Sequence, residues 1–265
     1  MSFEKQMYEV KEKWEMSYFS EQDSRRIEFI RTLIPDDVET LLDVGCGNGI
    51  LVNYLSEKHP DLLKRLCATD RSKTSLEFVK VENYESDITA LPFADGEFDI
   101  VVCLEVIEHL PQEVFAKALL ELERVTNKYV IISVPFNEDL DFKRVKCTKC
   151  QTEFSPFYHM HSFNDQRMEG LFENTKMTFV ELHKVESREI PRMRYLKKWI
   201  SRKINPNGFP PNCICPMCGY NELEKLKQTS NPSPNPDSTP KSRSGLSKWW
   251  PHREEPKWVA ALYKK

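Results

Sequence analysis

Residues that could bind a ligand follow a short apolar segment near residue 40. The run 41–44 is apolar except for Asp43, and it leads into Gly45-Cys46-Gly47-Asn48-Gly49. A strand that ends in such a turn and opens a helix presents backbone N–H groups to a ligand, and glycines let the ligand approach closely. A second acid, Asp70, ends the next apolar segment and could accept hydrogen bonds from both hydroxyl groups of a ribose. We predict a cofactor site at these two turns.

The glycine spacing separates two classes of cofactor. Dinucleotide-binding turns have the pattern G-x-G-x-x-G, whose third glycine would stand at position 50, but that residue is Ile50. The chain has G-x-G-x-G instead, with Asp43 before it. A carboxylate at that place suits the ammonium group of a bound amino acid better than it suits a pyrophosphate. The turn therefore favours a cofactor that contains an amino acid.

A second group of candidate residues consists of Glu105, Glu108 and His109, which follow a later apolar run. If the turn is helical, the two glutamates can face one side, because they are three residues apart. His109 could be a general base near the acceptor of a transferred group, since imidazole titrates near neutral pH. Alternatively, the three residues could bind Mg²⁺ together with His159 or His161, or they could be structural.

Two Cys-x-x-Cys pairs form a third group. Cys147-Thr-Lys-Cys150 and Cys215-Pro-Met-Cys218 have the spacing that lets two thiolates reach one tetrahedral ion. Four thiolates leave no open coordination position, so we predict a structural zinc site. The alternatives are replacement of one ligand by Cys213, participation of His159 or His161, or no metal.

Strand and helix patterns alternate along the first half of the chain, which predicts a doubly wound α/β sheet. Apolar runs predict strands, and apolar residues at helical spacing predict helices. The strands are expected at 40–44, 65–69, 99–104 and 129–134, and the helices at 50–58, 72–79 and 111–125.

The pattern changes after Pro135. Segment 164–174 is expected to be helical and 178–183 to be a strand, whereas 184–212 is basic and interrupted by prolines. The stretch 228–256 is rich in Ser, Pro, Asn and Lys, which predicts disorder. The predicted organisation is a helical cap at 1–34, a cofactor-binding core at 35–140, a zinc-binding and acceptor region at 141–227, a disordered loop at 228–256 and a final core strand at 257–265.

The motifs within residues 38–136 resemble those of the class I S-adenosylmethionine-dependent methyltransferases. Besides the glycine turn and Asp70, the pair Asp87-Ile88, the segment 91–93 and the segment 98–102 match this family in order. The resemblance implies a seven-stranded, Rossmann-like sheet and S-adenosylmethionine as cofactor. It also implies that the turn holds the methionine part, Asp70 the ribose and Asp87-Ile88 the adenine. The implied cofactor-binding residues are Asp43, Gly45, Gly47, Asn48, Gly49, Asp70, Asp87, Ile88 and Leu104.

Two shorter resemblances concern the acceptor side. The sequence Glu105 to His109 with a downstream histidine resembles the metal site of small-RNA 2′-O-methyltransferases, and in part the ubiquinone-pathway O-methyltransferases. The segment 147–163 resembles a zinc-bearing insertion of some bacterial methyltransferases of glycan and secondary-metabolite pathways. An insertion there would shape the acceptor pocket, so His161 joins His109 as a candidate catalytic residue.

Charge and hydropathy limit the kinds of partner and the location that the chain is expected to have. The 265 residues carry a net charge of −3, which gives no electrostatic argument for nucleic acid. A basic and aromatic cluster at 192–203 could contact phosphates or be a solvated helix face, and Trp249-Trp250 is expected to dock on the body or close over the acceptor. No apolar run is long enough for a membrane helix, and residues 1–18 lack a signal core, so we expect a cytoplasmic protein.

These patterns predict a methyltransferase that acts on an oxygen of a small molecule or of a sugar or glycan precursor. Methyl transfer needs mainly alignment, together with a base where the acceptor must lose a proton. An RNA 2′-O-methyltransferase is the alternative that the Glu-His residues and the basic cluster favour. A cofactor-binding regulatory or scaffold protein without catalysis is the third interpretation.

Overall fold

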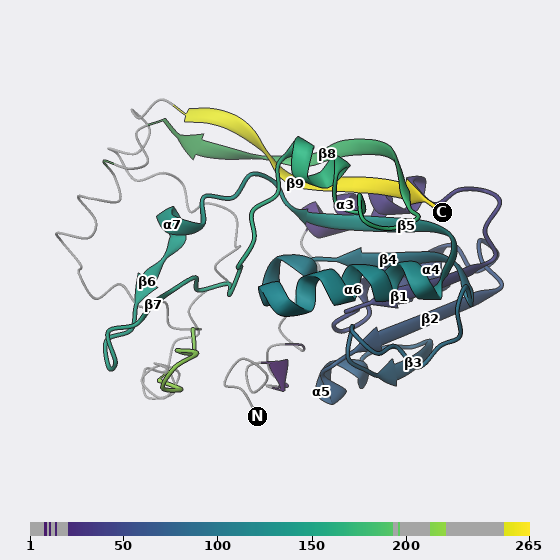
Figure 1. The fold of residues 1–265 in the computed structure, drawn as a ribbon, viewed down its shortest axis with the longest axis horizontal. Coiled ribbons are helices and arrows are strands. Elements are labelled where there is room, and N and C mark those ends of the chain that lie inside the picture. The colour runs from purple at the N-terminus through teal and green to yellow at the C-terminus, as the bar shows by residue number, and fades with distance from the viewer. Residues whose placement is uncertain are drawn as a thin grey trace. The chain divides into compact units, whose positions relative to one another are not determined.

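The structure is a computed structural model that describes residues 8–9, 11, 14, 21–192, 196, 213–220 and 252–265 (Figure 1). The chain divides into two compact units, which are described separately. The larger, called the core unit, comprises Lys5–Glu138, His159–Glu186 and Pro256–Lys265. The smaller, called the cysteine unit, comprises Met1–Glu4, Asp139–Tyr158 and Ser187–Glu255. The predicted clusters at 192–203 and at Trp249-Trp250 lie outside the described residues, except for Arg192 and Leu196.

Within the described residues, one sheet contains seven strands: β1 (Thr40–Val44), β2 (Arg65–Asp70), β3 (Glu82–Glu85), β4 (Phe98–Leu104), β5 (Thr126–Pro135), β8 (Thr178–Pro191) and β9 (His252–Lys264). Their order is β3-β2-β1-β4-β5-β9-β8. The first five strands are parallel, and β9 is antiparallel to β5. The prediction of a doubly wound, seven-stranded, Rossmann-like sheet is confirmed.

Both faces of the central strands are buried, which explains why these strands are continuous apolar runs. Successive side chains of a strand point to opposite faces. In β1, Leu41 and Leu42 are both fully buried but belong to different core clusters, and the same holds for Val101 and Val102 of β4. The sheet is therefore the middle layer between two hydrophobic cores.

Helices cover the two faces (Figure 1). α3 (Glu21–Thr32), α4 (Ile50–Lys58) and α5 (Lys73–Leu76) bury residues in the core cluster that includes Leu41. α6 (Gln112–Val125) and α8 (Asp165–Glu169) bury residues in the cluster that includes Leu42. α6 is amphipathic: Leu122 is fully buried, whereas Leu120 is 52% exposed.

Several elements differ from their predicted extent. β9 begins at His252, inside the stretch predicted to be disordered, and β8 continues to Pro191, beyond the strand predicted at 178–183. β3 was not predicted, because its sequence Glu-Asn-Tyr-Glu is polar and its side chains are largely exposed at the sheet edge. The predicted helices at 72–79 and 164–174 are shorter, as α5 and α8.

The cysteine unit contains a small antiparallel hairpin of β6 (Val145–Lys146) and β7 (Glu153–Phe154), preceded by the short helix α7 (Leu140–Lys143). Phe154 stacks on Tyr158 at a ring-centroid distance of 6.1 Å, and both side chains are buried. No helix among the described residues is long and apolar enough to cross a membrane.

Candidate functional site

The turn after β1 is built around three glycines with positive φ. Gly45, Gly47 and Gly49 have φ angles of 75°, 55° and 77°, a region that other residues rarely adopt. The N–H groups of Gly45 and Cys46 donate to the Thr69 carbonyl at 2.8 and 3.0 Å, which ties the turn to the end of β2. Gly49 is the N-cap of α4, so the free N–H groups of the first helical turn point toward the loop.

Neighbouring side chains approach all three glycines too closely to admit a Cβ atom without movement, as Val79 does at Gly49 (3.0 Å). A Cβ atom on Gly45 would lie 2.3 Å from Cγ2 of Val106, which follows β4. A Cβ atom on Gly47 would lie 3.1 Å from Cζ3 of Trp14. The glycines are therefore required by packing as well as by backbone conformation.

A buried acid, Asp43, and a half-buried acid, Asp70, stand at the ends of β1 and β2. Asp43 is 3% exposed, and burial, followed by the charge of Asp70, raises its pKa to about 7. Burial also raises the pKa of Asp70. The Asp70 carboxylate accepts hydrogen bonds from the N–H groups of Gly47 at 2.9 Å and Ser72 at 2.8 Å, so it joins the two loops. A carboxylate offers about four acceptor positions, which leaves room for two hydroxyl groups.

The remaining predicted cofactor residues follow the neighbouring strands. Asp87, after β3, accepts hydrogen bonds from the N–H and hydroxyl groups of Thr89 at 2.8 and 2.7 Å, and these bonds lower its pKa. Ile88 packs against the core cluster of α6, and Leu104 ends β4. The parallel strands bring these residues to the edge where ligands bind in open α/β sheets. Their contacts with a cofactor stay predictions.

Glu105, directly after β4, is held by the protein itself. It has a φ of 58°, and its N–H group donates to the Ser133 carbonyl at 2.9 Å. One carboxylate oxygen lies 3.2 Å from the Arg26 guanidinium, and the other accepts a hydrogen bond from the Trp258 indole at 3.1 Å. Burial raises the pKa of Glu105 despite the opposing charge of Arg26. Glu105 lies outside the group of described side chains that could hold an ion together, and its role as a metal ligand stays a prediction.

The other half of the motif forms a compact group, which we call the Glu-His cluster: Glu108, His109, His159 and Glu138. Donor atoms of Glu108, His109 and His159 all lie within 4.8 Å of one another. The two imidazole rings meet edge to face with centroids 4.7 Å apart, and Nδ1 of His159 is hydrogen-bonded to the Glu138 carboxylate. The cluster lies within the core unit.

Glu108 is the unusual member of the cluster. It is fully buried in η1 (Ile107–His109), and neither carboxylate oxygen has a hydrogen-bond partner among the described residues. Burial, followed by the charge of Glu105, raises its pKa well above the ordinary value. A buried carboxyl group without partners is costly, so the position is suited to a proton or to a cation.

His161 occupies a different environment from the one predicted. Its Nε2 donates to the Leu110 carbonyl at 2.8 Å, and its Nδ1 accepts from the Arg167 guanidinium at 3.1 Å, so the partners assign a neutral tautomer. Burial lowers its pKa. Because both ring nitrogens are engaged, His161 is replaced by His159 in the candidate metal set, and the geometry does not favour it as a base.

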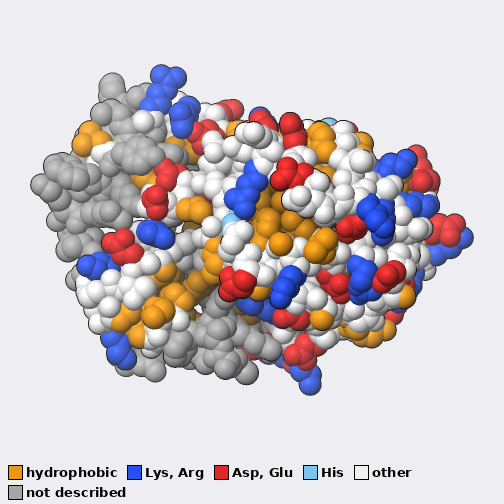
Figure 2. All heavy atoms as spheres, in the orientation of Figure 1, with side chains coloured by type: hydrophobic (Ala, Val, Ile, Leu, Met, Phe, Trp, Pro, Cys, Tyr) orange, Lys and Arg blue, Asp and Glu red, His pale blue; other side chains and the backbone are white. Residues whose placement is uncertain are grey.

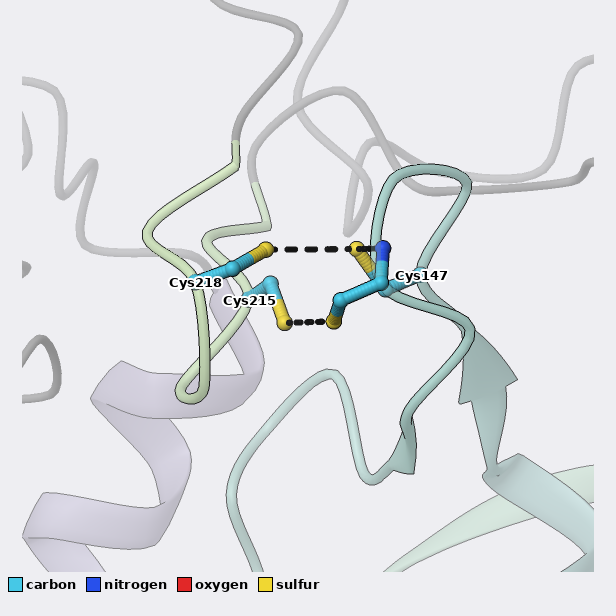
Figure 3. Close-up of side chains that lie close together, drawn as sticks. Cys147, Cys215 and Cys218 are labelled. Atoms are coloured by element: carbon cyan, nitrogen blue, oxygen red, sulfur yellow. Dashed lines mark hydrogen bonds between the residues drawn. The ribbon is translucent and has the colours of Figure 1, made fainter.

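The four predicted zinc ligands meet in the cysteine unit, as Figure 3 shows for the loops that carry Cys147 and the pair Cys215 and Cys218. The Cys147 and Cys218 sulfur atoms are 3.7 Å apart, and the sulfur atoms of Cys150 and Cys215 are 3.5 Å apart. Zinc–sulfur bonds of about 2.3 Å in a tetrahedron place sulfur atoms about 3.8 Å apart. The spacing thus fits a four-thiolate zinc site.

The two cysteine loops share one backbone design. Gly219 and Gln151 each stand four residues after the first cysteine of a pair, and both have positive φ, 67° and 64°. Their N–H groups donate to the carbonyls of Cys215 and Cys147 at 2.9 and 3.0 Å. Gly219 could be recognised from the sequence, whereas Gln151 carried no signal. Cys213 is buried beside the Pro156 carbonyl, outside the four-cysteine group.

Sequence comparisons agree with this geometry. Residues 42–133 match the family described as "Methyltransferase domain". The chain is 29% identical over 182 residues to an uncharacterized protein of Methanocaldococcus jannaschii, covering 62% of this chain and 75% of that protein. It is 34% identical over 83 residues to a ubiquinone biosynthesis O-methyltransferase of Pseudomonas paraeruginosa, covering 28% of this chain. That match spans 34% of the relative, about a third of its length.

Structural comparisons support the fold. The YcgJ protein of Bacillus subtilis gives a TM-score of 0.51 at 15% identity, covering 90% of this chain and 96% of that chain. The cyclase SpnF gives a TM-score of 0.52 at 10% identity, covering 92% and 80%. Since one of these proteins is named as a cyclase, the fold alone does not specify the reaction.

Fold, glycine turn and domain match together define a methyltransferase that uses a sulfonium cofactor. The matched segment, residues 42–133, is a methyltransferase domain, and the sheet that contains it has the Rossmann-like fold of the class I S-adenosylmethionine-dependent methyltransferases. The turn fits this cofactor, because the glycines form a cradle that a Cβ atom would fill and Asp43 is a buried acid beside it.

The close approach of Val106 makes Gly45→Ala more damaging than Gly96→Ala. Both glycines have positive φ, but the atoms nearest to a Cβ atom on Gly96 are 3.9 Å away. Both variants cost about 1–2 kcal/mol of backbone strain, and Gly45→Ala should cost a further ~1–3 kcal/mol from overpacking and weaken S-adenosylmethionine binding. Urea unfolding and calorimetric titration measure both effects. Equal losses in the two variants would contradict the role of the Val106 contact.

Proposed function

We propose that the protein transfers a methyl group to a hydroxyl oxygen of a small molecule or sugar, with the acceptor bound at the Glu-His cluster. The observation that supports this proposal is that Glu108 is fully buried beside two imidazole rings and has no hydrogen-bond partner among the described residues. Glu108 follows β4, whose neighbour β1 carries the glycine turn. Groups able to manage a proton therefore lie one strand away from the proposed cofactor site.

The cofactor site leaves the protein mainly a task of alignment. S-adenosylmethionine supplies a methyl group on a sulfonium centre, which is already electrophilic. We assign Asp43 to the ammonium group, Asp70 to the ribose hydroxyl groups and the N–H groups of the first turn of α4, which follow Gly49, to the carboxylate. Asp87 and Ile88 are assigned to the adenine, and Asn48 and Leu104 are assigned to the lining of the same cofactor site.

The acceptor hydroxyl group must lose its proton as the new carbon–oxygen bond forms. His159 is the better proton acceptor by geometry, because the Glu138 carboxylate holds its Nδ1 as a carboxylate holds the histidine of hydrolase triads. His109, the residue predicted from the sequence, contacts the His159 ring and is assigned to positioning. Glu138 had no sequence signal, because it precedes the cysteine region and matches no motif.

The same cluster is also the candidate for a second metal, with Glu108, His109 and His159 as ligands. Two imidazoles and one carboxylate suit Zn²⁺, Mn²⁺ or Fe²⁺, whereas Mg²⁺ prefers oxygen ligands. The predicted magnesium is therefore not favoured by this donor set. A bound cation would offset the burial cost of Glu108, so metal dependence has to be tested together with the histidines.

The choice of acceptor rests on three observations. The partial relatives named ubiquinone biosynthesis O-methyltransferase act, by name, on oxygen. The chain has a net charge of −3. Figure 2 shows Lys and Arg side chains interspersed with Asp and Glu over the described part of one face. Mixed charges support a small acceptor more than a nucleic acid, whose binding needs a basic surface.

We infer that the cysteine unit binds a structural zinc ion through Cys147, Cys150, Cys215 and Cys218. The matched loops and the sulfur spacing support this assignment. The described part of the unit has few buried apolar residues, so metal binding would supply folding free energy that this part does not.

Alanine at His159 should lower kcat about 10²–10⁴-fold while S-adenosylmethionine still binds. Glu138→Gln should also lower kcat, because the His159 ring would lose the carboxylate that holds it. His183→Ala is the matched control, because that histidine lies on β8 with its side chain 39% exposed. The assay follows labelled methyl transfer to a panel of phenols, sugars and small RNAs, with and without a chelator. Unchanged turnover in His159→Ala would contradict the assignment.

The other outcomes of this assay separate the remaining interpretations. Transfer to RNA alone would replace the small-molecule acceptor by the 2′-O-methyltransferase. Loss of activity on chelation, restored by Mn²⁺ or Zn²⁺ while the cysteine site stays loaded, would assign the cluster to metal binding. Cofactor binding without transfer to any acceptor would favour the non-catalytic interpretation.

Purified protein should contain about one tightly bound zinc ion per chain. Cys215→Ser should lose this zinc and lower the melting temperature, because the ion holds two chain segments together. Cys213→Ser should keep the zinc, since Cys213 lies outside the four-cysteine group. Elemental analysis and thermal unfolding measure both. Zinc retained at full stoichiometry in Cys215→Ser would contradict the proposed ligand set.

A further inference from the structure

The described N-terminal residues Tyr8, Glu9 and Trp14 lie against both loops of the proposed cofactor site. They belong to the core unit, as do the loops after β1 and β2. We call these three residues the N-terminal strap. The family motifs do not include this part of the chain, since the matched domain begins at residue 42.

Three contacts attach the strap to the loop after β2. The Ser72 hydroxyl group donates to the Tyr8 carbonyl at 2.8 Å, and the Thr74 hydroxyl group donates to the Glu9 carboxylate at 2.7 Å. The Arg71 guanidinium lies 4.8 Å from the centre of the Tyr8 ring. These residues directly follow Asp70, the acid assigned to the ribose.

The strap also contacts the glycine turn. Cζ3 of Trp14 lies 3.1 Å from the position that a Cβ atom on Gly47 would take. The Asn48 side-chain amide group donates to the Trp14 carbonyl at 3.4 Å. Within the strap, the Trp14 indole donates to the Tyr8 carbonyl at 2.7 Å, and the two rings stack with centroids 6.3 Å apart. An aromatic pair therefore covers the junction of both loops.

We propose that Trp14 is a cofactor-contacting residue whose ring faces the sulfonium end of S-adenosylmethionine, and that Tyr8, which stacks on Trp14 and lies beside Arg71, holds this ring in place. This inference rests on the proposed position of the methionine part in the glycine turn, which Trp14 touches. Aromatic faces attract cations, and the sulfonium group is cationic whereas the sulfur of the product S-adenosylhomocysteine is neutral. The strap would thus favour substrate over product, in addition to closing the site.

The charge of the sulfur provides the test. A cation–aromatic contact is worth about 3- to 30-fold in affinity, so Trp14→Leu should weaken S-adenosylmethionine binding by that factor more than S-adenosylhomocysteine binding. Trp14→Phe should keep most of the preference, because it keeps an aromatic face. Calorimetric titration of the full chain with each ligand measures the ratio of the two dissociation constants.

Lys11→Ala is the matched control on the same segment. The Lys11 ammonium pairs with the Glu77 carboxylate at the surface, so this variant should change neither constant. Equal weakening of both ligands in Trp14→Leu, or no weakening, would overturn the proposal. If Trp14→Leu does not fold, Trp14→Met is tested by the same ratio. Wild-type protein that binds neither ligand would reject the proposed cofactor site itself.

Discussion

The packing of Val106 against the backbone of Gly45 is the contact on which the arrangement of the site depends. Cγ2 of Val106 lies 2.3 Å from the place where a Cβ atom on Gly45 would stand, so only glycine fits there. Gly45 begins the turn after β1, and Val106 lies between Glu105 and Glu108 after β4. One close approach therefore sets the distance between the cofactor turn and the residues proposed to handle the acceptor.

Buried carboxyl groups dominate the electrostatics of this edge of the sheet. Asp43 and Glu108 are buried, Asp70 and Glu105 are partly buried, and burial is the largest cause of the raised pKa of each. Arg26 pairs with Glu105. Such a site is unfavourable for anions and is suited to positive groups. An ammonium, a sulfonium and a metal cation all meet this requirement, which explains why one edge can serve both proposed roles.

Local signals predicted the central part of the fold and of the site. The apolar runs gave β1, β4 and β5 because those strands are buried on both faces, and the glycines and acids marked the cofactor turn. β3 was missed because an exposed edge strand has no apolar pattern. The start of β9 was missed because the residues at 252–256 are polar although they pair in the sheet.

Contacts between distant segments could not be read from the sequence. His159 and His161 are two residues apart and equal as candidates by spacing, but Glu138 holds the first and Arg167 the second. Glu105 and Glu108 share one motif, yet Arg26 and Trp258 engage only Glu105. Gln151 resembles no turn former, but its loop repeats the hydrogen bonds of the Gly219 loop. In each case the partner comes from another element, and the fold decides which residue it meets.

The central claim is that the turn after β1 binds the amino-acid end of S-adenosylmethionine through Asp43. Its pKa of about 7 means that the carboxyl group is neutral in mildly acidic solution and ionised above neutral pH. Titration calorimetry of wild type and Asp43→Asn with S-adenosylmethionine between pH 5.5 and 8 (about one pH unit either side of neutral) tests the claim directly. Wild-type affinity should rise toward pH 7 and then level off, because the ionised carboxylate attracts the ammonium group. Asp43→Asn should bind more weakly, with a shallower rise. Wild-type affinity that does not change with pH, or an equal affinity of the variant, would contradict the account.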